Sequence, residues 1–310
     1  MRILVSGGAG FIGSHVTDRF LADEHEVAVV DNLATGNRSN LNPRAQFFQV
    51  DICDHAALAT VFASFRPEVV DHHAAHVDVR RSVLDPAHDA RTNILGTLNL
   101  LELSRVHGVH KFIFISSGGA VYGEPSRLPV DESYPPAPLC PYGAAKRCGE
   151  IYVELYWRLH ELDYTILRYP NVYGPRQNPK GEAGVVAIFS LQMLRGERPT
   201  IFGDGTKTRD YLYVSDVAEA NAAALAAGEA GRGVFNLGWG REVSDLDIFE
   251  GVRRALSVQI EPRYDAKRPG EVEHICLDAT RARAVLGWRP TVTLAEGLAR
   301  CAAYYRTVVG

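Results

Sequence analysis

Residues 1–22 read MRILVSGGAGFIGSHVTDRFLA, and this stretch decides the fold. The apolar run at 3–6 predicts a strand, and the apolar spacing within 11–22 predicts a helix. The glycines between them let the backbone turn sharply and approach a pyrophosphate, whose charge then lies at the N-terminus of the helix. A strand, a glycine-rich turn and a helix in this order predict a dinucleotide site. We expect that site to contain Gly7, Gly10, Phe11, Ile12 and Gly13.

The alternation of strand and helix continues outward from this turn. Apolar runs predict further strands at 26–31, 46–51, 68–71, 112–116 and 165–168. Helical spacing of apolar residues lies between them, at 56–65, 89–107 and 142–162. Continuously apolar strands need helices on both faces of the sheet, so the sequence predicts an α/β fold with a Rossmann-type, doubly wound parallel sheet.

The pattern changes after Tyr169, where Pro and Gly become frequent. A helix predicted at 214–227 and a strand predicted at 234–238 return to the sheet pattern, and mixed helix and loop follow. We therefore predict that residues 1–169, joined by 206–240, form the dinucleotide-binding domain. Residues 170–205 and 241–310 would form a smaller, C-terminal substrate-binding lobe.

Asp31 ends the second predicted strand and follows the glycine turn in the chain. A carboxylate at this place accepts hydrogen bonds from the adenosine ribose and repels a 2′-phosphate. The sequence therefore favours NAD over NADP as the cofactor.

Composition argues against several other classes of protein. The 310 residues are 46% hydrophobic and 23% charged, which is ordinary for a globular protein. A net charge of −4 and a pI of about 6.3 provide no basic field for nucleic acid or an anionic membrane. Five scattered cysteines without a C-x-x-C pair argue against a disulfide framework and a zinc site. We expect no nucleic-acid or membrane partner and a reduced, cytoplasmic location.

The run Asp71-His72-His73-Ala74-Ala75-His76 suggests a metal site at first sight. Alternation along a strand, however, places His72 and His73 on opposite faces of the sheet, and His76 lies beyond the strand end. We therefore predict no metal site and expect these histidines to be held by hydrogen bonds.

The run Tyr142-Gly-Ala-Ala-Lys146 opens a predicted helix and places Tyr142 and Lys146 on one face. A tyrosine with a pKa near 10 is a poor base at neutral pH, but a neighbouring ammonium favours its phenolate. We interpret Tyr142 as the base and Lys146 as the cation that lowers its pKa. Ser116 and Ser117 end a predicted strand at the carboxyl edge of the sheet, where such folds bind ligands. Ser117 would share the proton, with Ser116 as the alternative.

These motifs also occur together in a known family. They are the glycine turn 7–13, Asp31, Asp51, Ser117 with Val121-Tyr122-Gly123, Tyr142-x-x-x-Lys146, Arg168-Tyr-Pro-Asn-Val-Tyr-Gly-Pro175 and Arg209-Asp210-Tyr211. In this order they make the whole chain similar to the extended short-chain dehydrogenases/reductases. Within that family the chain most resembles the nucleotide-sugar 4-epimerases of the UDP-glucose 4-epimerase group.

The resemblance implies an isomerase with a tightly held NAD that is reduced and reoxidised in each cycle. Tyr142 would take the proton of the sugar 4-hydroxyl while hydride leaves C4, and the 4-keto sugar would turn and accept the hydride on its other face. The implied cofactor contacts, besides those of the glycine turn and Asp31, are Asn32, Asp51, Ile52, Ala74, Ala75, Asn93, Ser116, Tyr142, Lys146 and Tyr169. The implied UDP-sugar contacts are Ser117, Tyr142, Asn171, Arg209, Arg268, Glu271 and Ile275. The resemblance also implies a homodimer, formed through the helices predicted at 89–107 and 142–162.

The identity of the sugar stays open, with UDP-glucose and UDP-galactose as the first choice. Ile275 stands where some relatives carry a large aromatic residue, so UDP-N-acetylglucosamine is one alternative. UDP-glucuronate is another, because its carboxylate would suit one of three arginines, Arg80, Arg81 and Arg176.

Other reactions are less favoured by the same residues. Gly119 and Ala120 stand where sugar 4,6-dehydratases carry an Asp-Glu pair, and Ala120 stands where UDP-glucuronate decarboxylases usually keep a Glu. A non-catalytic NAD-binding sensor or scaffold is least favoured, because Tyr142 and Lys146 are both present.

Overall fold

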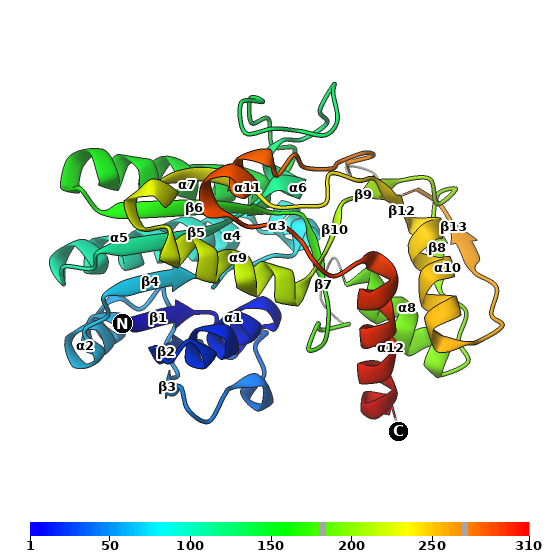
Figure 1. The fold of residues 1–310 in the computed structure, drawn as a ribbon, viewed down its shortest axis with the longest axis horizontal. Helices are drawn as coiled ribbons and strands as arrows, with labels where there is room; N and C mark the ends of the chain where they lie inside the picture. Colours follow the sequence, from blue (N-terminus) through cyan, green and yellow to red (C-terminus); the bar gives the residue numbers. More distant parts are fainter. Residues whose placement is uncertain (180–183, 268–271, 310) are drawn as a thin grey trace.

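The computed structural model describes residues 1–179, 184–267 and 272–309, and its central feature is a seven-stranded sheet (Figure 1). The strand order is β11-β6-β5-β4-β1-β2-β3, and every neighbouring pair is parallel. The strands are β1 (Arg2–Ser6), β2 (Glu26–Val30), β3 (Gln46–Phe48), β4 (Val69–His72), β5 (Lys111–Ser117), β6 (Asp163–Tyr169) and β11 (Gly233–Asn236). The prediction of a Rossmann-type, doubly wound parallel sheet is confirmed.

Helices cover both faces of this sheet, as its continuously apolar strands require (Figure 1). Val5 packs into the core on the side of α1 (Phe11–Ala22), α9 (Val214–Ala226) and α11 (Thr280–Leu286). Leu4, the preceding residue, packs into the core on the side of α2 (His55–Phe65), α5 (Gly96–Val106) and α7 (Pro141–His160). Side chains that alternate along β1 therefore lead into two separate hydrophobic layers.

The helix predicted at 89–107 is divided in the structure. It begins earlier, at α4 (Pro86–Ala90), passes through the π-helical turn η2 (Arg91–Leu95) and continues as α5. The early start follows from local chemistry, because the Asp85 side chain accepts a hydrogen bond from the His88 N–H at 3.0 Å and Pro86 occupies the first turn. The strand predicted at 46–51 is shorter, because residues after Phe48 leave the sheet.

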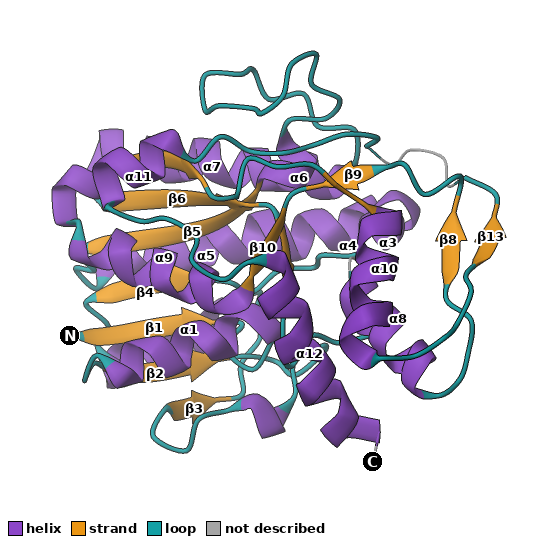
Figure 2. Cartoon of the chain, turned by 45° about the vertical axis from the view of Figure 1, so that its right-hand side comes forward, coloured by secondary structure: helices purple, strands orange, loops and turns teal. Residues whose placement is uncertain are grey.

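A second group of elements lies beyond the carboxyl ends of the strands (Figures 1 and 2). Its helices α8 (Val185–Leu194), α10 (Asp245–Leu256) and α12 (Leu294–Val309) pack on one another through Phe189, Phe249 and Leu298, which join the core on the α1 side of the sheet. Three small strand pairs accompany them: β7 (Asn171–Tyr173) with β10 (Tyr211–Tyr213), β9 (Thr208–Arg209) with β12 (Val243–Ser244), and β8 (Thr200–Phe202) with β13 (Arg263–Asp265). Within 241–310, α11 packs instead against α9 and β11. The predicted domain boundaries stay a prediction.

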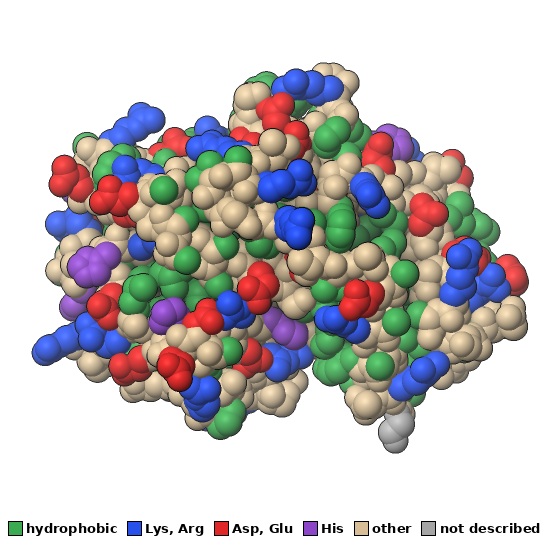
Figure 3. Space-filling model, viewed as in Figure 1, with side chains coloured by type: hydrophobic (Ala, Val, Ile, Leu, Met, Phe, Trp, Pro, Cys, Tyr) green, Lys and Arg blue, Asp and Glu red, His purple; other side chains and the backbone are tan. Residues whose placement is uncertain are grey.

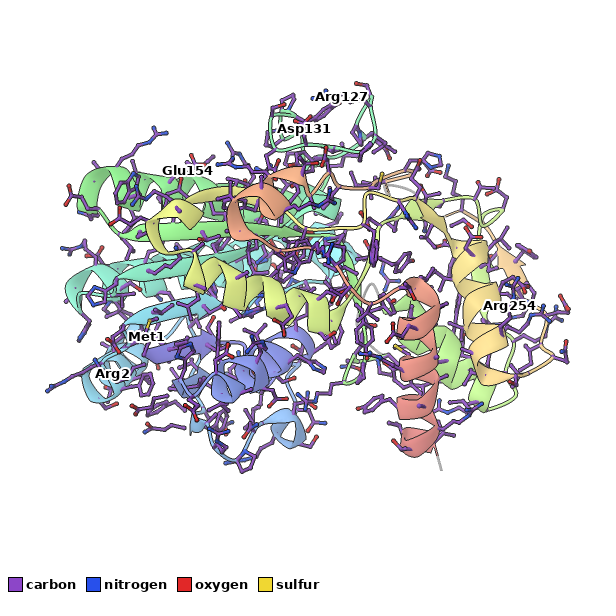
Figure 4. The ribbon with its side chains drawn as sticks, in the orientation of Figure 1. Met1, Arg2, Arg127, Asp131, Glu154 and Arg254 are labelled. Carbon is purple, nitrogen blue, oxygen red and sulfur yellow. The ribbon has the colours of Figure 1, made fainter. Side chains whose placement is uncertain are left out.

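One long loop separates the helical turn α6 (Gly118–Val121) from α7. Figure 4 places Arg127 and Asp131 in the part of this loop that projects from the molecule, where they form an ion pair at 2.9 Å. On the face drawn in Figure 3, acidic and basic side chains are interspersed. All five cysteines are free thiols. Within the described ranges, no helix combines the length and apolar character needed to cross a membrane.

Candidate active site

The glycine turn between β1 and α1 is a close backbone packing site. The Gly7 N–H donates to the Val30 carbonyl at 2.7 Å, and Gly7 has a φ of 72°. A Cβ atom at Gly7 would lie 2.6 Å from the Ala74 nitrogen, and one at Gly13 would overlap the Gly7 carbonyl oxygen. Gly10 is the N-cap residue of α1, and it has no side chain that could accept a hydrogen bond from the first N–H groups of the helix. The turn therefore leaves the first N–H groups of α1 to an anionic ligand, as a dinucleotide site requires.

Three polar residues predicted to bind the cofactor, Asp31, Asn32 and Asp51, lie beside this turn. The Asp31 carboxylate accepts hydrogen bonds from the N–H groups of Ala9, at 3.0 Å, and Leu33, at 2.8 Å. Burial raises the pKa of Asp31, although these two hydrogen bonds oppose the change. Asn32 donates to Asp51 at 2.9 Å, so the segments that follow β2 and β3 meet here.

Two other residues predicted to bind the cofactor, Ile52 and Asn93, form hydrogen bonds with other residues of the protein. Ile52 is buried in the core, and its carbonyl accepts a hydrogen bond from Asn99 at 2.9 Å. Asn93, which is 3% exposed, accepts from the His76 N–H and donates to the His76 carbonyl, both at 2.8 Å. The amide of Asn93 therefore clamps the chain that follows β4.

Lys146 lies one turn after Tyr142 on α7, at the carboxyl end of β5. Its side chain is 4% exposed, and its ammonium donates to the Ile115 carbonyl at 2.7 Å. Burial lowers the pKa of Lys146 to about 8, while the charges of Asp89 and Glu150 act in the opposite direction. Helix α7 thus holds the Lys146 ammonium close to the carboxyl edge of the sheet, and Tyr142 lies in the first turn of the same helix.

The two serines at the end of β5 have different surroundings. The buried hydroxyl of Ser116 donates to Glu150 at 2.6 Å. Ser117 is half-buried, and a Cβ atom at Gly119 would lie 4.0 Å from its Oγ atom and 3.7 Å from Asn171 Oδ1. Gly119, the Ser117 hydroxyl and the Asn171 amide therefore lie close together at the end of β5, which favours Ser117 as the reacting hydroxyl.

Asn171 and Arg209, predicted to bind the diphosphate, are held together by the residue between β9 and β10. The Asn171 N–H donates to the Asp210 carbonyl at 3.0 Å, and the Asp210 carboxylate accepts from the N–H groups of Trp239 and Gly240. Burial raises the pKa of Asp210 to about 6. Within the described part of the chain, the Arg209 guanidinium donates to main-chain carbonyls, at 2.7 Å and 3.3 Å.

The remaining predicted substrate and cofactor residues are placed as follows. Arg268 and Glu271 lie outside the described residues. Ile275 is buried in a small cluster with Tyr122, Val130 and Leu277. Tyr169 is buried on β6, and its hydroxyl accepts a hydrogen bond from Asn221 at 2.6 Å.

A buried ion pair that the sequence did not single out lies under α7. Arg168 donates two hydrogen bonds to Glu150, at 2.8 Å and 2.7 Å, and a third to the Tyr122 hydroxyl at 2.6 Å. Burial alone would raise the pKa of Glu150, but the bonds and charge of Arg168 hold it below its ordinary value. Glu150 follows Lys146 by one helical turn, which is the only local signal of its position; its partner comes from another strand.

Of the three histidines at the end of β4, His72 and His76 are hydrogen-bonded as predicted, whereas the buried Nε2 atom of His73 has no hydrogen-bond partner among the described residues. His72 lies between Ser6, at 2.7 Å, and Thr97, at 2.9 Å. His73 points to the other face of the sheet and lies 3.0 Å from Asp71. Among the described residues, no group of three His, Cys, Asp or Glu side chains could hold a metal ion.

The arginines considered for a sugar carboxylate lie on the surface or are paired. Arg176 donates to Asp18 at 2.8 Å and to Ser14 at 3.2 Å, both on α1. Arg80 and Arg81 are exposed on α3 (Val79–Leu84).

Comparison with known proteins agrees with this geometry. Residues 3–238 match the sequence model of the NAD dependent epimerase/dehydratase family. A UDP-glucose 4-epimerase of Mycolicibacterium smegmatis is 46% identical over 312 residues, which cover 99% of each chain. The crystal structure of a Thermotoga maritima UDP-glucose 4-epimerase with UDP-glucose is similar with a TM-score of 0.96 and 48% identity, over 100% of both chains. A Thermus thermophilus UDP-glucose 4-epimerase in complex with NAD has a TM-score of 0.94 and 44% identity, over 99% of both chains.

Proposed function

Because the chain belongs to the NAD dependent epimerase/dehydratase family, we propose that it interconverts UDP-glucose and UDP-galactose by 4-epimerisation. The observation that carries this function is the arrangement at the end of β5. Lys146 donates a hydrogen bond to the Ile115 carbonyl there, Ser117 follows on the strand, and Gly119 places no side chain beside Ser117. The protein is an isomerase.

The site fits NAD. Gly7 and Gly13 lie where a Cβ atom would collide with backbone, α1 begins without a side-chain cap, and Asp31 and Asn32 follow β2 beside this turn. Bound NAD would supply the acceptor for the hydride of the sugar C4 and the donor that restores it, with no net oxidation of the substrate. The chain's own contribution is to bind both ligands, orient them and move one proton.

Tyr142 moves that proton. As a phenolate it accepts the proton of the sugar 4-hydroxyl, and in the second half of the cycle it returns a proton to the same oxygen. The Lys146 ammonium stabilises the phenolate by its charge, and the Ser117 hydroxyl shares the proton with Tyr142. The 4-keto sugar has to rotate between the two halves, and Gly119 places no side chain beside Ser117 and Asn171 that would obstruct it.

Asn171 and Arg209 hold the UDP diphosphate. A guanidinium matches the geometry of phosphate oxygens, and the described contacts of Arg209 are to neutral carbonyls, so its charge is not matched by a carboxylate there. Binding at the diphosphate leaves the sugar free to rotate, which epimerisation at C4 requires.

The residues present disfavour elimination chemistry. Gly119 and Ala120 carry no carboxylate that would act as the acid or the base. Recognition of a sugar 6-carboxylate by Arg176 is also disfavoured, since that guanidinium is paired with Asp18.

A second copy of this chain is the partner that we propose for the outer face of α7. Ile151, Leu155 and Leu159 follow one another at four-residue spacing on this helix and are 49%, 39% and 63% exposed. Leu95, on the neighbouring turn η2, is 54% exposed. An apolar stripe of this kind is typical of a helix that packs against another helix. A homodimer would bury this apolar stripe.

We also propose a reduced, cytoplasmic location, which the free thiols of all five cysteines support.

The decisive experiment is proton NMR of the purified protein with UDP-glucose and no added NAD. We expect the anomeric signal of UDP-galactose to grow, with no accumulation of a keto sugar. Because no NAD is added, this turnover requires NAD that stays bound during purification. UDP-glucuronate and UDP-N-acetylglucosamine test the two alternative sugars in the same way. If all three substrates stayed unchanged with NAD supplied, the proposed function would be wrong. Tyr142→Phe is the matched control, because it should abolish turnover while NAD stays bound.

A further inference from the structure

A pocket of about 520 Å³ lies between α11, the segment that leads from it to α12, and the turn after β11. It is lined by Trp239, Arg283, Arg289, Pro290 and Thr291. Its volume is within the range of roughly 300–1,000 Å³ that is usual for small-molecule sites. The proposed reaction uses none of these five residues, so the pocket calls for a ligand of its own.

This pocket lies apart from the catalytic residues. Arg283 is on α11, which packs against α9 and β11. Trp239 packs against the hydrophobic core on that same side of the sheet. Tyr142 and Lys146 are on α7, which packs into the core on the opposite side. A ligand in this pocket would therefore not touch the proposed base.

The guanidinium groups around the pocket have no counter-charge. Arg283 and Arg289 are exposed at its wall, and a third guanidinium, that of Arg241, lies over the Trp239 ring at 5.7 Å from the ring centre. Within residues 1–179, 184–267 and 272–309, no Asp or Glu side chain pairs with any of these three arginines. Because the whole chain has a net charge of −4, the cluster does not reflect a general excess of basic residues. The three cations repel one another, and an anion bound between them would offset this repulsion.

The main chain at two walls of the pocket is held by buried carboxylates. The Trp239 N–H donates to Asp210 at 3.0 Å. The N–H and the hydroxyl of Thr291 donate to Asp216 at 3.0 Å and 2.7 Å. Asp210 and Asp216 are each 1% exposed. These walls are thus fixed before a ligand arrives, which lowers the entropy cost of binding.

We propose that this pocket is a second ligand site, which binds a nucleoside polyphosphate. The guanidinium groups of Arg283 and Arg289 bind phosphate oxygens, because their planar donors match two oxygens at once. The indole of Trp239 packs against the base, with Arg241 beside it. An inorganic anion would leave the indole unused, and an uncharged aromatic molecule would leave the cations unpaired. The proposal depends neither on the reaction nor on the identity of the sugar.

The test measures the binding of ATP to the NAD-saturated protein by isothermal titration calorimetry. Arg283→Gln and Arg289→Gln each remove one positive charge from the pocket, and Trp239→Leu removes the aromatic ring. Arg254→Gln is the matched control, because it removes the same charge from an exposed position on α10 (Figure 4). Arg209→Gln removes it from the proposed diphosphate site. Adenosine and inorganic triphosphate, titrated into the wild type, test the two halves of the ligand separately.

We expect Arg254→Gln and Arg209→Gln to bind ATP as the wild type does. Each of the three pocket variants should bind it about tenfold more weakly, and adenosine and triphosphate should each bind the wild type at least about tenfold more weakly than ATP does. If Trp239→Leu fails to fold by circular dichroism, the two arginine variants decide the result.

Three results would overturn the proposal. One is the lack of saturable ATP binding at millimolar concentration. Another is triphosphate binding as tight as that of ATP, because the indole would then contribute nothing. The third is a loss of ATP binding in Arg209→Gln but not in Arg283→Gln and Arg289→Gln, because ATP would then occupy the substrate site. None of these measurements uses a UDP-sugar, so their outcome is independent of the proposed epimerisation.

Discussion

Gly118 packs against Leu277 so closely that a Cβ atom at residue 118 would overlap the leucine side chain. Gly119, the next residue, faces the space between Ser117 and Asn171, where an added Cβ atom would meet only ordinary van der Waals contacts. Two adjacent glycines are therefore present for different physical reasons. The first allows Leu277 and its cluster to pack against α6, and we propose that the second leaves room for the sugar.

Alanine substitutions at Gly118 and Gly119 should distinguish a role in packing from a role in substrate binding. Gly118→Ala is expected to lower the free energy of unfolding by about 1–3 kcal/mol, because Leu277 or the backbone must move. Gly119→Ala should leave the melting temperature close to that of the wild type and raise KM for the UDP-sugar about tenfold, the equivalent of about 1.4 kcal/mol of binding. Thermal unfolding and steady-state kinetics check both. A raised KM in Gly118→Ala together with a loss of stability in Gly119→Ala would contradict the proposal that the sugar lies beside Gly119.

The serines at the end of β5 give a second prediction. Ser117→Ala should lower kcat by about 10²-fold or more without a change in stability, because its hydroxyl faces the open space. Ser116→Ala removes a hydrogen bond to buried Glu150 and should lower the free energy of unfolding by about 1–3 kcal/mol, with a smaller effect on kcat. The two variants are matched controls for each other. If kcat fell further in Ser116→Ala than in Ser117→Ala, Ser116 rather than Ser117 would be the reacting hydroxyl.

Local spacing made much of this site predictable from sequence. The glycine turn, the Tyr142–Lys146 pair and the end of β5 are short runs whose geometry follows from the neighbouring residues. Contacts between distant segments were not predictable in this way. Arg168 meets Glu150 across two elements, and Leu277 reaches Gly118 from the last part of the chain. The strands of the seven-stranded sheet other than β3 were predicted well because their central residues are apolar, whereas the six short strands between 171 and 265 were not predicted. The division of 89–107 depends on the Asp85 cap and on the π-helical turn that contains Asn93.

The exposed stripe on α7 predicts how the protein associates. Ile151→Glu should convert a dimer into a monomer at micromolar concentration, because a carboxylate would be buried at the interface without a partner. Val285→Glu is the matched control: Val285 is 41% exposed on α11, which packs against the other side of the sheet. Light scattering measures the mass of both. A monomeric wild type would contradict the proposed homodimer.

Glu150 and Arg168 test what a buried ion pair contributes here. Glu150→Gln leaves the guanidinium without its counter-charge and should lower the free energy of unfolding by about 3–5 kcal/mol. The double variant Glu150→Gln/Arg168→Met removes both charges and should recover part of that loss, since neither buried charge then lacks a partner. Denaturant unfolding of the two variants measures the difference. If the double variant were less stable than Glu150→Gln, the pair would not be the cause of the loss.

Asp210 gives the stability of the protein a predictable dependence on pH. Its folded-state pKa, raised by burial to about 6, lies above the value of about 4 for an aspartate in the unfolded chain. Between these two pH values the folded protein therefore binds a proton that the unfolded chain does not. The stabilisation from this group is present below pH 4 and is lost as pH rises through 6. The loss amounts to about 3 kcal/mol at most.

Asp210→Asn isolates this effect, because asparagine does not titrate. One of the N–H groups that bind the carboxylate, those of Trp239, Gly240 and Leu277, should lose its acceptor, so the variant should be less stable than the wild type at pH 4 and should bind the UDP-sugar more weakly through Arg209. As pH rises from 4 to 7, however, the wild type should lose its advantage over the variant. Urea unfolding at fixed pH values measures this difference, and Asp85→Asn, at an exposed cap, should show no such trend. An advantage that stayed constant or grew with pH would show that Asp210 is already ionised at pH 4 in the folded protein, with the backbone N–H groups outweighing its burial.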